Sequence, residues 1–186
     1  MNQTINLADI RSGQIKDLAG IDLSGANLSG ADLTGANLRG ANLRCNLRGA
    51  DLTGADLRDA DCRNADLRGA ILLDIVGKNI SLAGAFLAGA VLSHLDLTRV
   101  DFRGCDLRGA TLIGTILQQA DLSNTNLSGA DLSQADLEEA ILNGAILRGT
   151  NFSEANLFCA QVERVILEGA SLNDACIEGT PWDLSL

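Results

Sequence analysis

The sequence predicts an all-β solenoid, and three observations lead to this fold class. First, a five-residue unit with a central apolar residue repeats from Leu18 to Leu43 and, after one missing residue, from Leu47 to Ile177. Second, Leu occupies 27 of the 33 central positions, a small residue usually lies two positions before it, and Gly often lies two positions after it. Third, aromatic residues make up only 3% of the chain, so Ala and Leu must build a narrow core. Periodicity of this kind takes precedence over other fold assignments.

The length of the unit predicts its shape. A period of five fits neither the face of a helix, with its period of 3.6, nor a strand, with its period of 2. Short extended triplets separated by corners explain it, because side chains alternate between faces within a triplet. In Asp-Leu-Arg, the Leu then points inward and the two charged residues point outward. Coils stacked about 4.8 Å apart would form continuous Leu columns, with each unit contacting only its neighbours.

The units themselves resemble a known family. Residues 21–40 read IDLSG, ANLSG, ADLTG, ANLRG. They match the A(D/N)LXX motif of pentapeptide repeat proteins, most closely the Ala- and Leu-rich members abundant in cyanobacteria, and the match covers about residues 16–180. The resemblance implies a right-handed quadrilateral β-helix with four units per turn. Its 33 units would make about 8 turns, with residues 20 apart stacked on each other.

The ends and two irregular segments complete the predicted organisation. Residues 1–14 are expected to form a short capping helix, with Thr4 or Asn6 as N-cap, Leu7 and Ile10 on one face and Gly13 as the stop signal. Residues 15–180 are the repeat region. One residue is missing at 43–47, where we expect a tightened corner, and the consensus fails at 74–79, where Gly77 replaces the central Leu and we expect a distorted corner or small bulge. Residues 181–186 form a tail, with Trp182 predicted to cover the last core layer.

Charge and hydropathy narrow the classes of function. The net charge is −10; residues 1–93 carry a net −1 and residues 94–186 a net −9. An acidic surface opposes direct binding to nucleic acid, which needs cations to neutralise phosphates. No run approaches the roughly 18 apolar residues of a membrane span, and the N-terminus lacks the pattern of a secretory signal. We therefore expect a cytoplasmic protein that binds neither nucleic acid nor membranes.

Residue types that would carry catalysis or hold a cofactor are nearly absent. His94 is the single histidine, and its slot is an exposed corner. Asp51, Asp56, Asp61 and Asp66 imitate a metal-binding run, but a four-sided coil would point them in four directions. No P-loop sequence occurs. The cysteines show no CxxC spacing; Cys45, Cys62 and Cys105 occupy inward slots, whereas Cys159 and Cys176 occupy outward slots. We expect no catalytic activity, no cofactor and no metal.

The outward slots contain the candidate site. Several triplets place Asp and Arg side by side, which predicts surface ion pairs. Other outward slots are apolar where Asp or Asn is usual. Stacking at 20 residues would bring five of these side chains into one mid-rod protein-contact patch on two adjoining faces: Ile71, Leu73, Phe86, Val91 and Ile113. The alternative interpretation is that such side chains fold over neighbouring corners.

Three functions follow from these features. The leading hypothesis is a non-catalytic protein-interaction or scaffold protein, with the partner unknown. The family resemblance implies a second: some relatives bind DNA gyrase by imitating duplex DNA and so confer quinolone resistance. The nearly uniform Leu centres and the short tail after residue 180 fit that type less well. The third is a self-assembling structural element, that is, a homo-oligomer.

Overall fold

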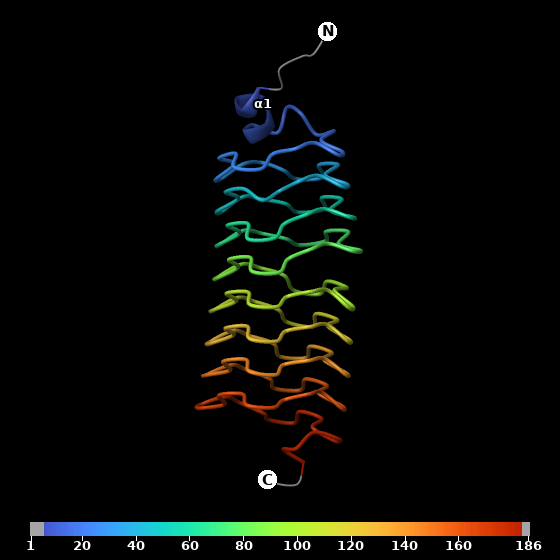
Figure 1. Cartoon of the computed structure of the whole chain (residues 1–186), viewed down its shortest axis with the longest axis vertical. Coiled ribbons are helices and arrows are strands. Elements are labelled where there is room, and N and C mark those ends of the chain that lie inside the picture. Colours follow the sequence, from blue (N-terminus) through green and yellow to red (C-terminus); the bar gives the residue numbers. More distant parts are fainter. Residues whose placement is uncertain (1–5, 184–186) are drawn as a thin grey trace.

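Parallel β-bridges join residues 20 apart along the chain. The computed structural model describes residues 6–183. Ile71 bridges to Val91, for example, and Val91 bridges to Thr111. Because one unit has five residues, four units complete one coil, and the coils stack into a long rod (Figure 1). Each side of a described coil contributes a single bridged residue rather than a longer strand. The predicted all-β solenoid is confirmed.

Each coil has four faces, which we number in chain order. In the coil that contains Gly77, face 1 is residues 71–73, face 2 is 76–78, face 3 is 81–83 and face 4 is 86–88. Every later coil repeats these faces at intervals of 20 residues. The face of any outward side chain follows directly from its number.

A regular unit bonds nearly all of its backbone polar groups. The N–H of Leu132 donates to the carbonyl of Asn151 in the next coil at 2.8 Å, and the N–H of Asp131 donates to the carbonyl of Ala110 in the preceding coil at 2.9 Å. The Asp131 side chain then accepts from the N–H of Ser133 at 3.0 Å. This side-chain acceptor, which satisfies a turn N–H, is the physical reason for Asp or Asn before the centre.

The core is a single apolar column of Leu and Ala. Leu28, Leu132 and Phe152 are completely buried, as is Ala140 in the small slot. Burying one Leu stabilises the fold by roughly 1.5–3 kcal/mol, whereas ordering each residue of backbone costs about 1–2 kcal/mol. A long, uninterrupted column is therefore needed before the coil becomes stable.

The missing residue at 43–47 tightens one corner, as predicted. In regular corners a hydrogen bond spans three residues, as from the Ala41 N–H to the Leu38 carbonyl at 3.0 Å. At the shortened corner, the Cys45 N–H reaches the Leu43 carbonyl at 2.7 Å over only two residues. The affected bridges, such as Asn42↔Asp61, then join residues 19 apart. The corner absorbs the deletion, and the ladder continues without a shift.

A short helix precedes the first coil. Helix α1, Leu7–Arg11, lies at the N-terminal end of the rod (Figure 1), and the Asn6 side chain accepts from the Ala8 N–H at 2.9 Å. Ile10 is buried in the core cluster, but Leu7 is exposed, so the predicted two-residue apolar face buries only one of its members. Gly13 follows the helix with a φ of 72°. Thr4, the other N-cap that we considered, lies outside the described residues.

The C-terminal end of the core is less completely covered. Leu167, Leu172 and Ile177 are only partly buried, unlike the central residues of the middle coils. Trp182 is 9% exposed and belongs to the same apolar cluster. Trp182 is therefore packed into the core cluster, and its predicted role as the cover of the last core layer stays a prediction. Residues 184–186 fall outside the described part.

Candidate functional site

Four of the five predicted contact residues lie on face 1. Ile71 and Val91 are bridged neighbours on adjacent coils. Leu73 and Ile113 lie two residues after a bridged position on the same face, separated by the coil that carries Ser93. Ile71 is 36% exposed, and the other three side chains are half-buried. Their backbones are fixed by the ladder, for instance by the Leu72 N–H bonded to the Val91 carbonyl at 2.9 Å.

Face 1 has no charged outward side chain across these three coils. We call this surface the neutral strip, and its six members are Ile71, Leu73, Val91, Ser93, Thr111 and Ile113. Asp51 lies one coil before the strip and Asp131 one coil after it, so a carboxylate marks each end. Our sequence analysis missed Ser93 and Thr111, although the register of 20 residues, applied to polar as well as apolar slots, would have found them.

The neutral strip lacks hydrogen bonds that its neighbours make. On the flanking coils, the Thr53 N–H donates to Asp51 Oδ1 at 2.9 Å and the Ser133 N–H donates to Asp131 Oδ1 at 3.0 Å. Within the described residues, the equivalent N–H groups of Leu73, Ser93 and Ile113 have no such acceptor. Each missing bond would contribute about 0.5–1.5 kcal/mol. The apolar side chains recover little of this, because they remain partly in contact with water.

Phe86, the fifth predicted residue, lies on face 4. It is 47% exposed and bridges Asp66 on one side and Asp106 on the other. The sequence had placed it on the adjoining face, and the structure agrees. Phe86 is therefore an isolated aromatic between two carboxylates rather than a member of the neutral strip.

The predicted Asp–Arg surface pairs form within their own triplets. Arg63 Nε and Nη2 donate to the two carboxylate oxygens of Asp61 at 2.8 and 2.7 Å, and Arg103 makes the same fork on Asp101 at 2.9 and 2.7 Å. The hydrogen bonds from Arg58 hold the pKa of Asp56 at about 2. Because the arginine side chains are about half exposed, solvent screens these pairs and each contributes little to stability.

The remaining candidates for chemistry lie where the sequence placed them. Cys45, Cys62 and Cys105 are buried, and burial raises the pKa of Cys45 to about 11 and that of Cys105 to about 12. Cys159 and Cys176 are exposed. His94 is an exposed corner residue with a φ of 61°. Across residues 6–183, no three His, Cys, Asp or Glu side chains are close enough to hold a metal ion.

The segment around Gly77 departs from the regular coil. We expected a distorted corner or a small bulge. Asp74 and Asn79 keep the positive φ of ordinary corners, 55° and 61°, but within the described residues the corner hydrogen bond from the Ile75 N–H to the Leu72 carbonyl is missing, so this corner is distorted. The core also changes. Large residues occupy four small slots that Ala usually fills, two on the coil of Gly77 and two on the next: Ile75, Ile80, Leu95 and Val100. A Cβ on Gly77 would lie 3.5 Å from Leu97 and 3.6 Å from both Ile75 and Ile80, so these side chains close around the position that lacks a side chain.

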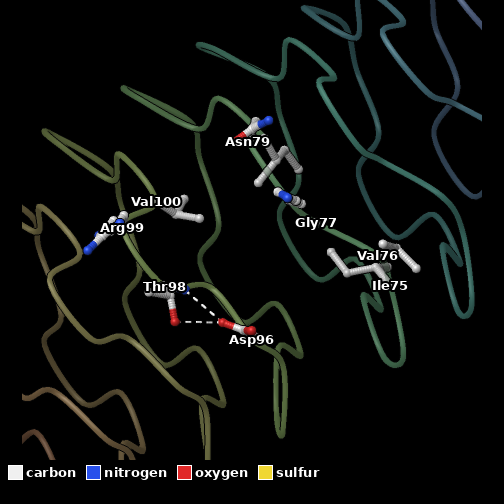
Figure 2. Close-up of a pocket in the computed structure, with 10 residues that line it drawn as sticks. Ile75, Val76, Gly77, Asn79, Asp96, Thr98, Arg99 and Val100 are labelled. Atoms are coloured by element: carbon white, nitrogen blue, oxygen red, sulfur yellow. Dashed lines mark hydrogen bonds between the residues drawn. The ribbon is translucent and has the colours of Figure 1, made fainter.

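Next to these large corner residues, the hydrogen-bond ladder between the two coils is open on face 2. The bridge expected between Val76 and Asp96 is missing from the described residues, although the same face is bridged before it, at Asp56↔Val76, and after it, at Asp96↔Ile116. A groove of about 550 Å³ lies at this place. Figure 2 shows residues 75–79 along one coil and Asp96 to Val100 along the next, on its two sides.

The fold is that of a four-sided parallel β-solenoid built from five-residue units. The pentapeptide repeat family model matches residues 17–44, 44–74, 78–109, 105–144 and 142–174. The chain belongs to the pentapeptide repeat family, whose members form right-handed quadrilateral β-helices.

Solved structures of several family members are similar to this chain. HetL, a pentapeptide repeat protein involved in heterocyst differentiation regulation from the cyanobacterium Nostoc sp. strain PCC 7120, is 30% identical over 88% of each chain, with a TM-score of 0.51. A protein of the Arabidopsis thaliana thylakoid lumen is 32% identical over 58% of this chain and 70% of its own, with a TM-score of 0.25. The plasmid-mediated fluoroquinolone resistance protein QnrB1 is 19% identical over 91% and 93%, with a TM-score of 0.37.

Comparison with curated proteins gave no match. Among residues 6–183, the structure contains no helix of the length and apolar character needed to cross a membrane.

Proposed function

We propose that this chain is a non-catalytic protein-interaction rod of about eight coils, closed at its N-terminal end by α1, that binds a protein partner through the neutral strip. One observation carries the proposal. Ile71 and Val91 occupy slots where Asp or Asn would bond the backbone, and so the strip gives up hydrogen bonds for partly exposed apolar surface. Exposed apolar clusters on a soluble surface usually mark contacts with other molecules.

The shape of the strip supports a partner of low charge. Its six side chains lie on one face and their backbones are held by ladder hydrogen bonds, so binding would cost little entropy for ordering this surface. The carboxylates of Asp51 and Asp131 at its two ends favour a partner with cations at the edges of its apolar centre. The likeness to HetL, a protein involved in regulation, supports a regulatory binding role.

The proposal is tested with a variant that removes the apolar surface and returns the slots to the consensus. Ile71→Asn/Val91→Asn should unfold at the same or a higher urea concentration than wild type, because Asn supplies the missing acceptors. Wild type and variant are then used for affinity capture from a lysate of the source organism. The matched control is Ile146→Asn/Ile166→Asn, a bridged aliphatic pair on face 4.

A protein retained by wild type and by the control, but lost by the strip variant, supports the proposal. Equal retention by all three proteins would show that the neutral strip is not the binding surface. Sedimentation of the wild type at tens of micromolar identifies the remaining case: association that the strip variant abolishes would make the partner a second copy, which is the self-assembly alternative.

Gyrase binding by DNA mimicry stays a hypothesis that the family resemblance alone implies. Duplex DNA carries one negative charge per about 1.7 Å of its axis. In the N-terminal half, the carboxylates of Asp56, Asp61 and Asp66 are each paired with an arginine of the same triplet, so only the C-terminal half presents a strongly negative surface. Unchanged gyrase supercoiling in a large excess of the protein would eliminate this alternative.

A further inference from the structure

Backbone groups without hydrogen-bond partners line both sides of the groove on face 2. In a regular coil, the central N–H bonds to the next coil, as Leu57 does to the Val76 carbonyl at 2.9 Å. Among the described residues, the N–H of Gly77 has no acceptor and the carbonyl of Asp96 has no donor. These two groups would be partners if the ladder were closed.

The same opening continues along the groove. The N–H of Asn79 and the carbonyl of Thr98 also lack their ladder partners within residues 6–183, as do the N–H of Asp96 and the carbonyl of Ile75. Both donors and acceptors are therefore free on each of two facing edges. An unpaired edge of this kind is a template for pairing with another strand.

The side chains around the groove select the chemistry of an occupant. Ile75, Ile80 and Val100 are buried beneath it and form an apolar floor, and Val76 is 47% exposed at its rim. Lys78 also lines the groove and has no ion pair among the described residues. The nearby carboxylates have other partners: Asp59 lies 3.6 Å from Arg39 Nε, and Asp96 accepts from the Thr98 hydroxyl at 2.7 Å.

We propose that this groove binds an extended peptide segment of another protein, with small aliphatic and acidic residues alternating along it. The segment pairs its backbone with the free edges, places aliphatic side chains on the apolar floor, and turns a carboxylate outward to Lys78, because side chains alternate along a strand. An inorganic anion is disfavoured, since it would leave the free carbonyls of Ile75, Asp96 and Thr98 without donors. The volume of about 550 Å³ lies within the usual range of ligand sites.

The test uses the whole protein and a fluorescein-labelled peptide, Val-Glu-Val-Glu-Val, in an anisotropy titration at low salt. Two peptides serve as controls: Val-Lys-Val-Lys-Val, and the Glu peptide with N-methylated backbone amides. Lys78→Glu reverses the rim charge, and Arg48→Glu is the matched control, with the same charge change in the same slot of face 4. Amide hydrogen exchange detected by NMR reports the backbone groups directly.

We expect the Glu peptide to bind with a Kd below about 1 mM, and Lys78→Glu to weaken it about tenfold while Arg48→Glu changes it little. The Lys peptide and the methylated peptide should not bind. The amides of Gly77, Asn79 and Asp96 should exchange fast in the free protein and slow down when the Glu peptide is present. Absence of binding near 1 mM, binding that survives methylation, or binding without slower exchange at these amides would overturn the proposal.

The groove site is independent of the neutral strip, which lies on face 1. Ile71→Asn/Val91→Asn should therefore bind the Glu peptide as wild type does. Loss of peptide binding in this variant would mean that the groove does not act as a separate site.

Discussion

Two stretches of face 2, centred sixty residues apart, differ in how the coils are joined. Around Leu137, a large central side chain lies between the small residues Ala135 and Ala140, and the ladder to the next coil is intact, with the Leu137 N–H bonded to the Asn156 carbonyl at 2.6 Å. Around Gly77, the central side chain is absent and the flanking slots are large, and the ladder opens. A coil therefore closes onto the next one when large central residues alternate with small corner residues. Filling the core volume with large corner residues alone does not close the ladder.

The largest effect is expected from breaking the regular stretch. Leu137→Gly should lower the free energy of unfolding by about 3–6 kcal/mol, because a fully buried side chain is removed between two alanines. Urea unfolding followed by far-UV circular dichroism measures the change. A second variant adds Ala135→Ile, Ala140→Ile, Ala155→Leu and Ala160→Val, which copies the arrangement around Gly77.

This graft should recover at least half of the lost stability and create a new opening in the ladder. The amide of residue 137 should then exchange as fast as that of Gly77. A graft that gains nothing over Leu137→Gly alone would show that the large corner residues do not compensate for the missing centre.

A smaller effect separates two kinds of glycine. Gly109 has a φ of 61° and open space where a Cβ would lie, so Gly109→Ala should cost about 1–2 kcal/mol from backbone strain alone. Gly77 lacks a positive φ, and its Cβ would make ordinary contacts at 3.5–3.6 Å. Gly77→Ala should therefore raise stability by about 0.4–1 kcal/mol. Thermal unfolding of both variants gives the comparison, and equal destabilisation would contradict it.

The smallest effect concerns the paired carboxylates of the coil before the opening. Arginine hydrogen bonds hold the pKa of Asp56 at about 2 and lower the pKa values of Asp61 and Asp66. Since a lowered folded-state pKa stabilises the fold above the unfolded value of about 3.9, this contribution is complete at pH 6 and is lost as the pH falls toward 2. The triple Asp→Asn variant keeps the turn acceptors and should show a flatter loss of stability between pH 5 and pH 2.5. The difference should total about 1 kcal/mol, since these pairs are largely exposed. An unchanged slope in acid unfolding would contradict it.

Much of this architecture was predictable because the unit is local and repeated. The inward Leu, the outward Asp–Arg pairs and the tightened corner at Cys45 follow from the period. The face of each contact residue follows from the register of 20 residues that the family resemblance implied. The function of the contact residues stays a prediction. The failed consensus at 74–79 predicted a local distortion, but it did not predict the opened ladder, because the register survives there.

A second signal was present in the sequence. Ile75, Ile80, Leu95 and Val100 are all too large for the small slot, and they surround the one central position without a side chain. Their sizes indicate a changed packing arrangement. Whether the coils close over it depends on backbone distances that only three-dimensional packing determines. For the same reason, the free edges of the groove could not be inferred from residue types.

The shortened corner at 43–47 has a consequence for how the surface is organised. Because one residue is lost without displacing any face, the bridged partner changes from 20 residues away to 19 only for the coil that crosses it. Every outward slot after residue 47 can therefore be addressed by counting. Side chains placed 20 residues apart would stand in a straight row, about 4.8 Å from one to the next. The rod can therefore present surface groups at fixed, regular spacings, and each spacing can be changed by substituting a single residue.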